Sequence, residues 1–243
     1  MRKPDYGIDA PVMQRNLAIL GVVLVALYWL APSIGGYSVW PGGAFLLSAA
    51  VMYWGSRVGK LRLRDRLLEA IPWRGDEHVL DVGCGAGLML VGAAKRSPRG
   101  KAVGVDIWRS VDLSGNRPER TEDNARIERV ADKVEVRDGD ARELPFPDES
   151  FDVVLSSWAL HNIAVGTGRA KAIWEIVRVL KPGGHVGILD IEDTAEYVRE
   201  LRARGMLEVR AVGPSFLFLL PTYQVTARKP DAAVLSDLPK SAS

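Results

Sequence analysis

The sequence has little cysteine, little histidine and almost no net charge. Among its 243 residues are one cysteine, Cys84, and three histidines, and the formal net charge is +2. A lone cysteine excludes a disulfide scaffold within the chain, and these scattered residues predict no zinc site. The small net charge gives no general reason to expect nucleic-acid binding. The charged fraction of 26% is typical of a folded protein and too high for disorder or an all-membrane bundle.

Charged residues are missing altogether between positions 16 and 56. Residues 17–30 form one apolar run, and a second covers 44–54, after Pro41 and two glycines. A membrane span needs roughly 20 mostly apolar residues. The sequence therefore predicts a cytoplasmic N-terminus at 1–16 and two transmembrane helices at about 17–34 and 37–56. A signal peptide, a buried hairpin of a soluble domain and a monotopic dip into the bilayer are the alternatives.

Basic residues flank this apolar segment on both sides. Arg2, Lys3 and Arg15 precede it, and five basic residues follow it, namely Arg57, Lys60, Arg62, Arg64 and Arg66. Because positive flanks stay in the cytoplasm, we expect a hairpin with both ends inside and a cytoplasmic catalytic domain. Residues 57–75 are predicted to form a basic, amphipathic juxtamembrane helix that lies against anionic headgroups of the bilayer.

The remainder, from residue 76 to 229, alternates short apolar runs with helical stretches, which predicts an α/β domain with a mostly parallel sheet. Strands are expected at 78–82, 102–106, 134–136, 151–156 and 185–191, and helices at 88–96, 119–131, 168–180 and 194–204. Two last strands, at 207–212 and 222–227, have no helix between them, which indicates an antiparallel hairpin at one edge of the sheet. Residues 230–243 are predicted to be a flexible tail.

A glycine loop follows the first of these strands. Gly83, Gly85 and Gly87 let the backbone approach a ligand closely, and the helix that follows offers free N–H groups. Asp106 ends the next strand, where a carboxylate can accept two ribose hydroxyls. The loop departs from the G-x-G-x-x-G pattern of dinucleotide enzymes. Asp81 adds a negative charge beside it, which suits a cationic ligand better than a pyrophosphate.

Further motifs follow in a fixed order: Gly139-Asp140-Ala141, a block from Leu144-Pro145-Phe146 to Phe151-Asp152-Val153-Val154, and Leu180-Lys181-Pro182-Gly183-Gly184. Together with residues 80–87 and Asp106, this set resembles the class I S-adenosylmethionine-dependent methyltransferases over roughly residues 76–229. The resemblance implies a Rossmann-like, seven-stranded fold and S-adenosylmethionine as the cofactor. The first sixty residues lie outside it.

The resemblance also implies a role for each matching position. Asp81 and the loop from Gly83 to Gly87, with Cys84 and Gly85, are expected to hold the methionine end of the cofactor. Asp106 is expected to bind the ribose, and Ile107 or Trp108 to pack on the adenine. The adenine amino group is expected to contact Asp140, with Ala141 donating from its backbone. Trp158 is expected to face cofactor and substrate, with plain core packing as the alternative.

An insertion relative to the family lies at residues 109–118. Asp112, Ser114 and Asn116 within it are candidates to cap the following helix or to form a flap over the adenine, and we favour the cap.

His161, after the fourth predicted strand, is the candidate general base, with a structural or substrate-orienting role as the alternative. The segment Ser156-Ser157-Trp158-Ala159 replaces the Asn/Asp-Pro-Pro-Tyr motif, which disfavours DNA and glutamine targets.

The apolar residues 216–220 are candidates to line an acyl or prenyl entrance or to dip into the bilayer, with a buried edge strand as the alternative. The sequence thus predicts a membrane-anchored methyltransferase for a small lipophilic acceptor, with the lipid bilayer as a partner. The same enzyme acting on a soluble molecule, a non-catalytic cofactor-binding membrane module and a dehydrogenase are the alternatives. The sequence does not predict an oligomeric state.

Overall fold

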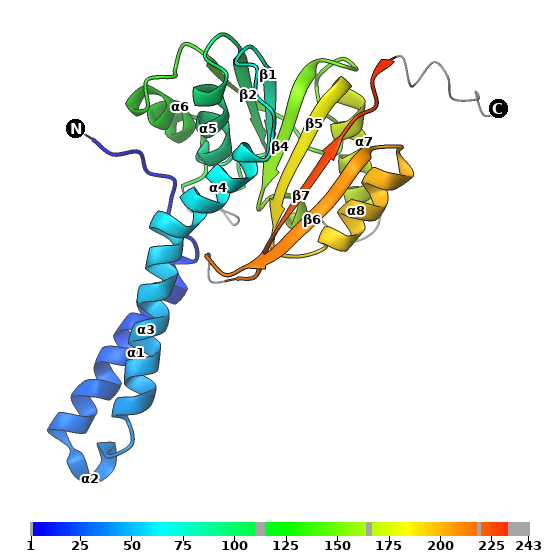
Figure 1. Cartoon of the computed structure of the whole chain (residues 1–243). Helices are drawn as coiled ribbons and strands as arrows, with labels where there is room; N and C mark the ends of the chain where they lie inside the picture. The colour runs from blue at the N-terminus through cyan, green and yellow to red at the C-terminus, as the bar shows by residue number, and fades with distance from the viewer. Residues whose placement is uncertain (1, 110–114, 164–166, 218–219, 233–243) are drawn as a thin grey trace.

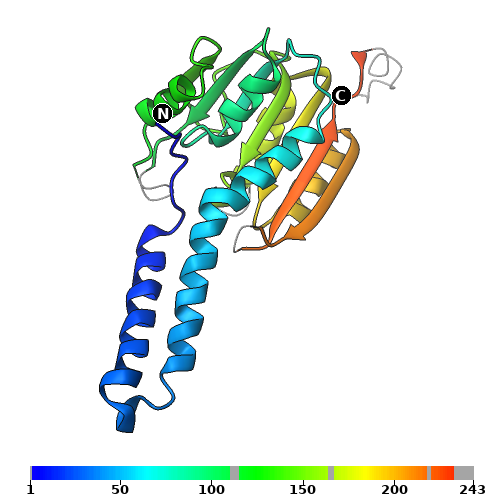
Figure 2. The same cartoon turned by 60° about the vertical axis from the view of Figure 1, so that its left-hand side comes forward.

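A computed structural model describes residues 2–109, 115–163, 167–217 and 220–232 of the chain. A long helical hairpin projects from a single α/β domain (Figure 1). The helical part comprises α1 (Pro11–Leu30), α2 (Pro32–Gly35), α3 (Val39–Trp54), the π-helical turn η1 (Gly55–Gly59) and α4 (Lys60–Glu69). The last three are continuous, so one unbroken helix leads from the hairpin into the domain (Figure 2).

Two glycines allow α1 and α3 to approach each other closely. A Cβ atom on Gly21 would lie 2.7 Å from Cγ of Leu46 and 2.9 Å from the carbonyl oxygen of Gly42. Such small residues at a helix crossing are typical of helices that pack inside membranes. The outward faces of both helices keep large apolar side chains exposed, among them Ile19, Val22, Trp29, Leu30, Trp40 and Leu47.

The helix bounds differ from those expected. α1 begins at Pro11, six residues before the predicted start, because proline favours the first helical turn. Of the helices in the described part of the chain, α1 alone is long and apolar enough to cross a membrane. α3 has 16 residues, which is slightly shorter than a span requires. The prediction of two transmembrane helices is therefore unconfirmed.

Seven strands form one sheet in the order β3-β2-β1-β4-β5-β7-β6. Their bounds are β1 (His78–Val82), β2 (Lys101–Asp106), β3 (Val134–Asp138), β4 (Phe151–Ser157), β5 (Leu180–Asp190), β6 (Leu207–Ser215) and β7 (Thr222–Arg228). The first five are parallel, and β7 pairs antiparallel with both β5 and β6. The predicted seven-stranded, mostly parallel sheet with an antiparallel edge hairpin is confirmed.

Alternate residues of each strand point to opposite faces of the sheet, and each face has its own core. Val79 of β1 packs with Leu67, Leu68, Met89 and Leu90, which come from α4 and α5 (Leu88–Arg96). Leu80 packs in the other core, with residues of α7 (Thr167–Val179) and α8 (Thr194–Ala203), among them Ile173, Ile176, Tyr197 and Leu201. α6 (Pro118–Ile127) and the short 3-10 helix η2 (Leu160–Asn162) complete the domain. The tail predicted at 230–243 lies outside the described residues from position 233 onward.

The strand order changes direction between β1 and β4, because the chain builds β2 and β3 on one side of β1 and then returns to place β4 on the other. In open α/β sheets, ligands bind outside the carboxyl ends of the strands at such a switch point. The fold therefore points to the loops that follow β1, β2, β3 and β4.

Candidate active site

A cavity of about 590 Å³ opens at this switch point. The loops after the first four strands line it, together with residues from the N-terminal segment and α4. Most of the predicted site residues lie in its wall, namely Gly83, Cys84, Gly85, Asp106, Ile107, Asp140, Ala141, Trp158 and His161. Asp81, Gly87 and Trp108 are not among the lining residues.

The glycine loop adopts a backbone that only glycine accepts without strain. Gly83, Gly85 and Gly87 have φ angles of +73°, +49° and +79°, in the left-handed region. A Cβ atom on Gly83 would also lie 2.2 Å from Cβ of Ala159. The backbone N–H groups of Gly83 and Cys84 both donate to the carbonyl oxygen of Val105, at 2.8 and 3.1 Å. These two hydrogen bonds fix the loop against β2, where it forms part of the cavity wall.

Asp81 lies behind this loop and is fully buried. Its Oδ2 atom accepts a hydrogen bond from the backbone N–H of Leu90, at 2.9 Å, in the first turn of α5. Its Oδ1 atom has no hydrogen-bond partner among the residues that the structure describes. Burial raises the pKa of this carboxyl to about 7, and the negative charge of Asp106 adds to the rise. A nearby positive charge would relieve this penalty, so the acidic site fits a cationic sulfonium cofactor.

Asp106 ends β2 and turns its buried carboxylate toward the loop. Its Oδ2 atom accepts from the N–H of Gly85 at 2.9 Å, and Oδ1 accepts from the N–H of Trp108 at 2.7 Å. Oδ1 also accepts from Nδ2 of Asn116 at 3.1 Å. Asn116 therefore does not cap α6, whose N-cap is Arg117 without a side-chain hydrogen bond. That prediction was wrong because α6 begins at Pro118, which makes residue 117 the N-cap and leaves Asn116 one position too early. Asp112 and Ser114 lie outside the described residues.

The two candidates for packing on the adenine point in different directions. Ile107 lines the cavity and is 46% exposed. Trp108 packs against the core around α5, and its indole Nε1 donates to Oδ1 of Asp138 at 2.6 Å. Ile107 is therefore the side chain in position for contact with a base.

Asp140 and Ala141 line the cavity on the side of β3. The carboxylate of Asp140 forms an ion pair with Arg142, 2.5 Å from Oδ2 to Nη2, and this pair lowers its pKa. The loop itself is anchored from behind, because the N–H of Leu144 donates to the buried carboxylate of Glu175, at 2.6 Å. Trp158 lies across the cavity, partly buried against the core, and its backbone N–H donates to Leu189 at 2.8 Å.

His161 contacts a carboxylate that the sequence analysis missed. Its Nδ1 atom lies 2.5 Å from Oδ1 of Asp190, which ends β5 and is fully buried. The backbone N–H groups of His161 and Ile191 and the hydroxyl of Tyr197 also donate to this carboxylate, at 3.2, 2.8 and 3.1 Å. Burial and the charge of Asp190 raise the pKa of Tyr197, so its hydroxyl keeps its proton. A carboxylate can only accept, so Nδ1 of His161 carries the hydrogen that points at Asp190.

The N-terminal segment forms a further wall that the sequence did not predict. Tyr6, Asp9 and Ala10 line the cavity, and Tyr6 is only 8% exposed. The ammonium of Lys60, buried in α4, donates to the carbonyl oxygens of Tyr6 and Gly7 at 2.9 and 2.7 Å and to Asp9 at 3.1 Å. We call residues 4–10 the strap.

For one of the missed residues, Asp190, the sequence contains a pattern that could have identified it. Asp190 ends a buried apolar strand, as Asp106 does, and a carboxylate at the carboxyl end of a parallel strand predicts a site residue. The strap had no such signal, because Asp5 and its partner Asn124 are 119 positions apart.

Comparison with known proteins decides between the ligand classes that fit this cavity. A family model described as a methyltransferase domain matches residues 80–188. Residues 80–188 form an S-adenosylmethionine-dependent methyltransferase domain. This match covers the glycine loop, Asp106, Asp140 and His161, and it makes S-adenosylmethionine the cofactor of the domain, as the acidic, glycine-lined cavity also indicates.

Curated relatives carry methyltransferase names. Over 113 residues the chain is 40% identical to a demethylmenaquinone methyltransferase of Symbiobacterium thermophilum, covering 46% of this chain and 41% of the relative. It is 35% identical over 158 residues to the 27-O-demethylrifamycin SV methyltransferase of Amycolatopsis mediterranei, covering 61% and 54%. The chain spans about half the length of these curated relatives.

Solved structures share the methyltransferase fold. A SAM-dependent methyltransferase from Aquifex aeolicus matches with a TM-score of 0.54 and 22% identity, over 72% of this chain and 97% of that one. The [4+2]-cyclase SpnF matches with a TM-score of 0.58 and 21% identity, over 71% and 81%. Because one of these neighbours is named as a cyclase, the fold alone does not decide the chemistry.

Proposed function

We propose that this protein is a membrane-anchored methyltransferase that transfers the methyl group of S-adenosylmethionine to a small lipophilic acceptor, with His161 as the general base. The observation that carries the proposal is the single cavity that glycine loop, Asp106 and His161 line together. This arrangement would bring a cofactor and a proton acceptor to the same space, which a non-catalytic binding module does not need.

The cofactor supplies an electrophilic methyl group on a positively charged sulfur. The chain's own residues then have to exclude water, position the acceptor and take its proton. The apolar side chains of Leu160, Ile163 and Leu220 line the same cavity as His161, and they suit a hydrophobic acceptor. Nε2 of His161 would take a proton from an acceptor hydroxyl or acidic carbon, and Asp190 would stabilise the resulting imidazolium.

The helical hairpin supports the membrane part of the proposal. Its exposed faces are apolar, and Gly21 and Gly42 pack at the crossing of α1 and α3. The basic residues that follow α3 include Arg57 and Arg62, whose guanidinium groups lie 5.8 and 5.4 Å from the rings of Tyr53 and Trp54. Aromatic and basic side chains together at a helix end favour the membrane–water interface. The hairpin would then hold the cavity close to the cytoplasmic surface of the bilayer.

The acceptor class follows from the same features and from the relatives. Two of the relatives described above are named for a menaquinone precursor and for a rifamycin, and both names denote methylation of a small molecule. A soluble small acceptor is the second candidate, because the cavity is large enough for a compact molecule without a tail.

The test uses the full chain purified in detergent, with S-adenosylmethionine carrying a labelled methyl group and a lipid extract as the acceptor source. We expect label in an organic-phase product with wild-type protein. The variant Asp106→Ala should lose cofactor binding and labelling together, whereas the exposed-site control Asp132→Asn should keep both. Label only in water-soluble metabolites would shift the proposal to the soluble acceptor. Cofactor binding without labelled product in either extract would contradict it.

A further inference from the structure

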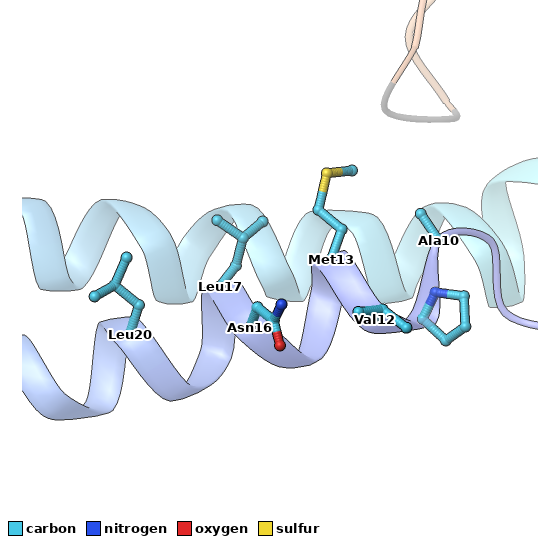
Figure 3. A pocket seen from close by; sticks show the side chains of 7 residues that line it. Ala10, Val12, Met13, Asn16, Leu17 and Leu20 are labelled. Atoms are coloured by element: carbon cyan, nitrogen blue, oxygen red, sulfur yellow. The ribbon is translucent and has the colours of Figure 1, made fainter.

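A second apolar hollow, of about 530 Å³, lies along the first three turns of α1. Figure 3 shows its lining, which consists of Ala10, Pro11, Val12, Met13, Asn16, Leu17 and Leu20. We call it the α1 groove. Ala10 lines both the α1 groove and the active-site cavity, so the two are adjacent at the end of the strap.

The α1 groove lies along α1 beside its contact with α3. Met13, Leu17 and Leu20 follow one another at spacings of four and three residues, so they share one side of the helix, and Ala10 is the N-cap residue at its start. Val12 and Met13 are 58% and 49% exposed. Gly21, which packs against Leu46 of α3, follows Leu17 by four residues, so Leu17 lies at the edge between the α1 groove and α3. Asn16 is the sole polar side chain among the lining residues, so the α1 groove can offer a ligand little besides apolar contact.

The shape of the α1 groove fits a linear chain. From residue 10 to residue 20 a helix rises about 15 Å at 1.5 Å per residue, which is roughly half of the ~30 Å hydrocarbon thickness of a bilayer. At its inner end, Leu220 lines the active-site cavity together with Ala10. Leu220 lies just before β7, in the connection from β6 whose other end, Phe216, is exposed.

We propose that the α1 groove binds the linear apolar tail of the methyl acceptor while the acceptor's head group occupies the cavity beside His161. The inference rests on the proposed function and names its substrate class: an amphiphile whose reactive head is joined to a long acyl or prenyl chain. The tail passes Ala10 and follows Met13, Leu17 and Leu20 away from the domain. In a bilayer the tail exchanges lipid contacts for protein contacts, so the α1 groove orients the acceptor more than it increases affinity.

The first experiment measures contact without requiring turnover. The probe is a naphthohydroquinone with a prenyl-length alkyl tail that carries a photoactivatable diazirine, mixed with the full chain in detergent and S-adenosylhomocysteine. We expect cross-links at Met13, Leu17 or Leu20. A phosphatidylcholine with the same diazirine tail is the control, because it carries the tail without the hydroquinone head. Equal labelling of the α1 groove by both probes, or labelling confined to α3, would overturn the inference.

The second experiment separates head from tail. Leu17→Trp fills the α1 groove, and Leu47→Trp places the same side chain on α3, where Leu47 is 65% exposed and lies outside the groove. With the tailed hydroquinone as acceptor, we expect Leu17→Trp to lower kcat/KM about tenfold and Leu47→Trp to leave it unchanged. The tail-free hydroquinone should be methylated equally by both variants. Equal loss for both acceptors, or for neither, would contradict the α1 groove as a tail site.

The two proposals can fail separately. If wild-type protein methylates neither hydroquinone and no lipid from the extract, the proposed function fails, and the cross-links still decide whether tails bind in the α1 groove. If the tailed and tail-free acceptors are methylated at equal kcat/KM and the cross-links are absent from α1, the proposed methyltransferase function is supported and the tail site in the α1 groove is contradicted.

Discussion

Asn124 and Asp5 exchange two hydrogen bonds. The backbone N–H of Asp5 donates to Oδ1 of Asn124 at 2.8 Å, and Nδ2 of Asn124 donates to the carbonyl oxygen of Asp5 at 3.0 Å. The same Nδ2 donates to the carbonyl oxygen of Ala86 in the glycine loop, at 2.9 Å. One side chain on α6 therefore connects the strap to the glycine loop.

This connection predicts that the strap contributes to cofactor binding. Asn124→Ala removes the shared contacts, and a hydrogen bond contributes about 1 kcal/mol net. We expect the Kd for S-adenosylmethionine to rise about fivefold to tenfold by calorimetric titration, and the strap to be cut faster by a protease. Arg126→Ala, on the exposed side of the same helix, is the control. An unchanged Kd in Asn124→Ala would show that strap and loop act independently.

The contact between His161 and Asp190 predicts a base with a defined proton position. A general base contributes typically ~10²–10⁴ in rate, so His161→Gln and Asp190→Asn should lower kcat within that range. Binding of S-adenosylmethionine should be unchanged in both variants. Tyr197→Phe removes one hydrogen bond from Asp190 and should cost only several-fold in rate.

A pH profile distinguishes this role from a structural one. Wild-type protein and His161→Gln should have pH–rate profiles of different shape, because the variant lacks the imidazole that would accept the proton. A variant that keeps the wild-type slope with a reduced amplitude would instead mean that His161 only positions the acceptor.

Asp81 predicts a pH dependence of stability. Its pKa is about 7 in the folded protein and 3.8 for an unperturbed carboxyl, so the folded state binds this proton more tightly than the unfolded state. Stability from this group is fully present below about pH 4 and is lost as pH rises to about 7. We expect Asp81→Asn to gain Tm relative to wild type over that range and to hold a constant difference above it.

Thermal melts of both proteins at pH 4 to 8 measure this difference. Adding S-adenosylmethionine should shrink it, because a positive charge near the loop favours the ionised carboxylate of Asp81. The variant Asp132→Asn, at an exposed position, controls for the loss of a charge. A difference that does not change with pH would place the pKa of Asp81 near its ordinary value.

At Gly83, the addition of a single methyl group is expected to disrupt the glycine loop. Gly83→Ala places a Cβ atom 2.2 Å from Cβ of Ala159 on a backbone with φ of +73°. The left-handed conformation alone costs about 1–2 kcal/mol for a residue other than glycine. We expect a lower Tm and loss of cofactor binding. Gly43→Ala, a helical position with nothing within 4 Å, should be neutral or stabilising. Adding Ala159→Gly to Gly83→Ala should restore part of the loss, and no restoration would assign the whole effect to the backbone.

Sequence patterns predicted those strands and helices whose ends are marked by neighbouring residues, such as glycines. β1 was expected at 78–82 and α5 at 88–96, and both have these bounds, because an apolar run ends at glycines and a helix follows. α6 was expected to reach residue 131 but ends at Ile127; the chain then turns at Arg129, which has a φ of +60°, without a glycine or proline to mark it. β5 begins at Leu180, five residues before the predicted start, because Leu180 pairs with Phe151 ahead of a bulge.

The candidate site was predictable where family motifs cover it and not elsewhere. Asp106, Asp140 and the glycine loop line the cavity or hold it, and each belongs to a motif with characteristic spacing. Lys60 and Tyr6 meet across 54 positions through a backbone carbonyl, and no residue pattern records such a contact. The same holds for Asn116, which donates to Asp106 ten positions before it.

The π-helical turn at 55–59 determines how the domain faces the hairpin. An α-helix advances about 100° per residue, and a π-turn accommodates one residue more than an α-turn does. Deleting one residue there would rotate the domain by about 100° around the helix axis relative to α3. The strap is hydrogen-bonded to Lys60, which follows the π-helical turn, whereas α1 packs on α3, which precedes it. The strap and α1 meet at Ala10, so the deletion would put them out of alignment there. The rotation of the α/β domain relative to α3 is thus set by the winding of five residues, none of which lines the cavity.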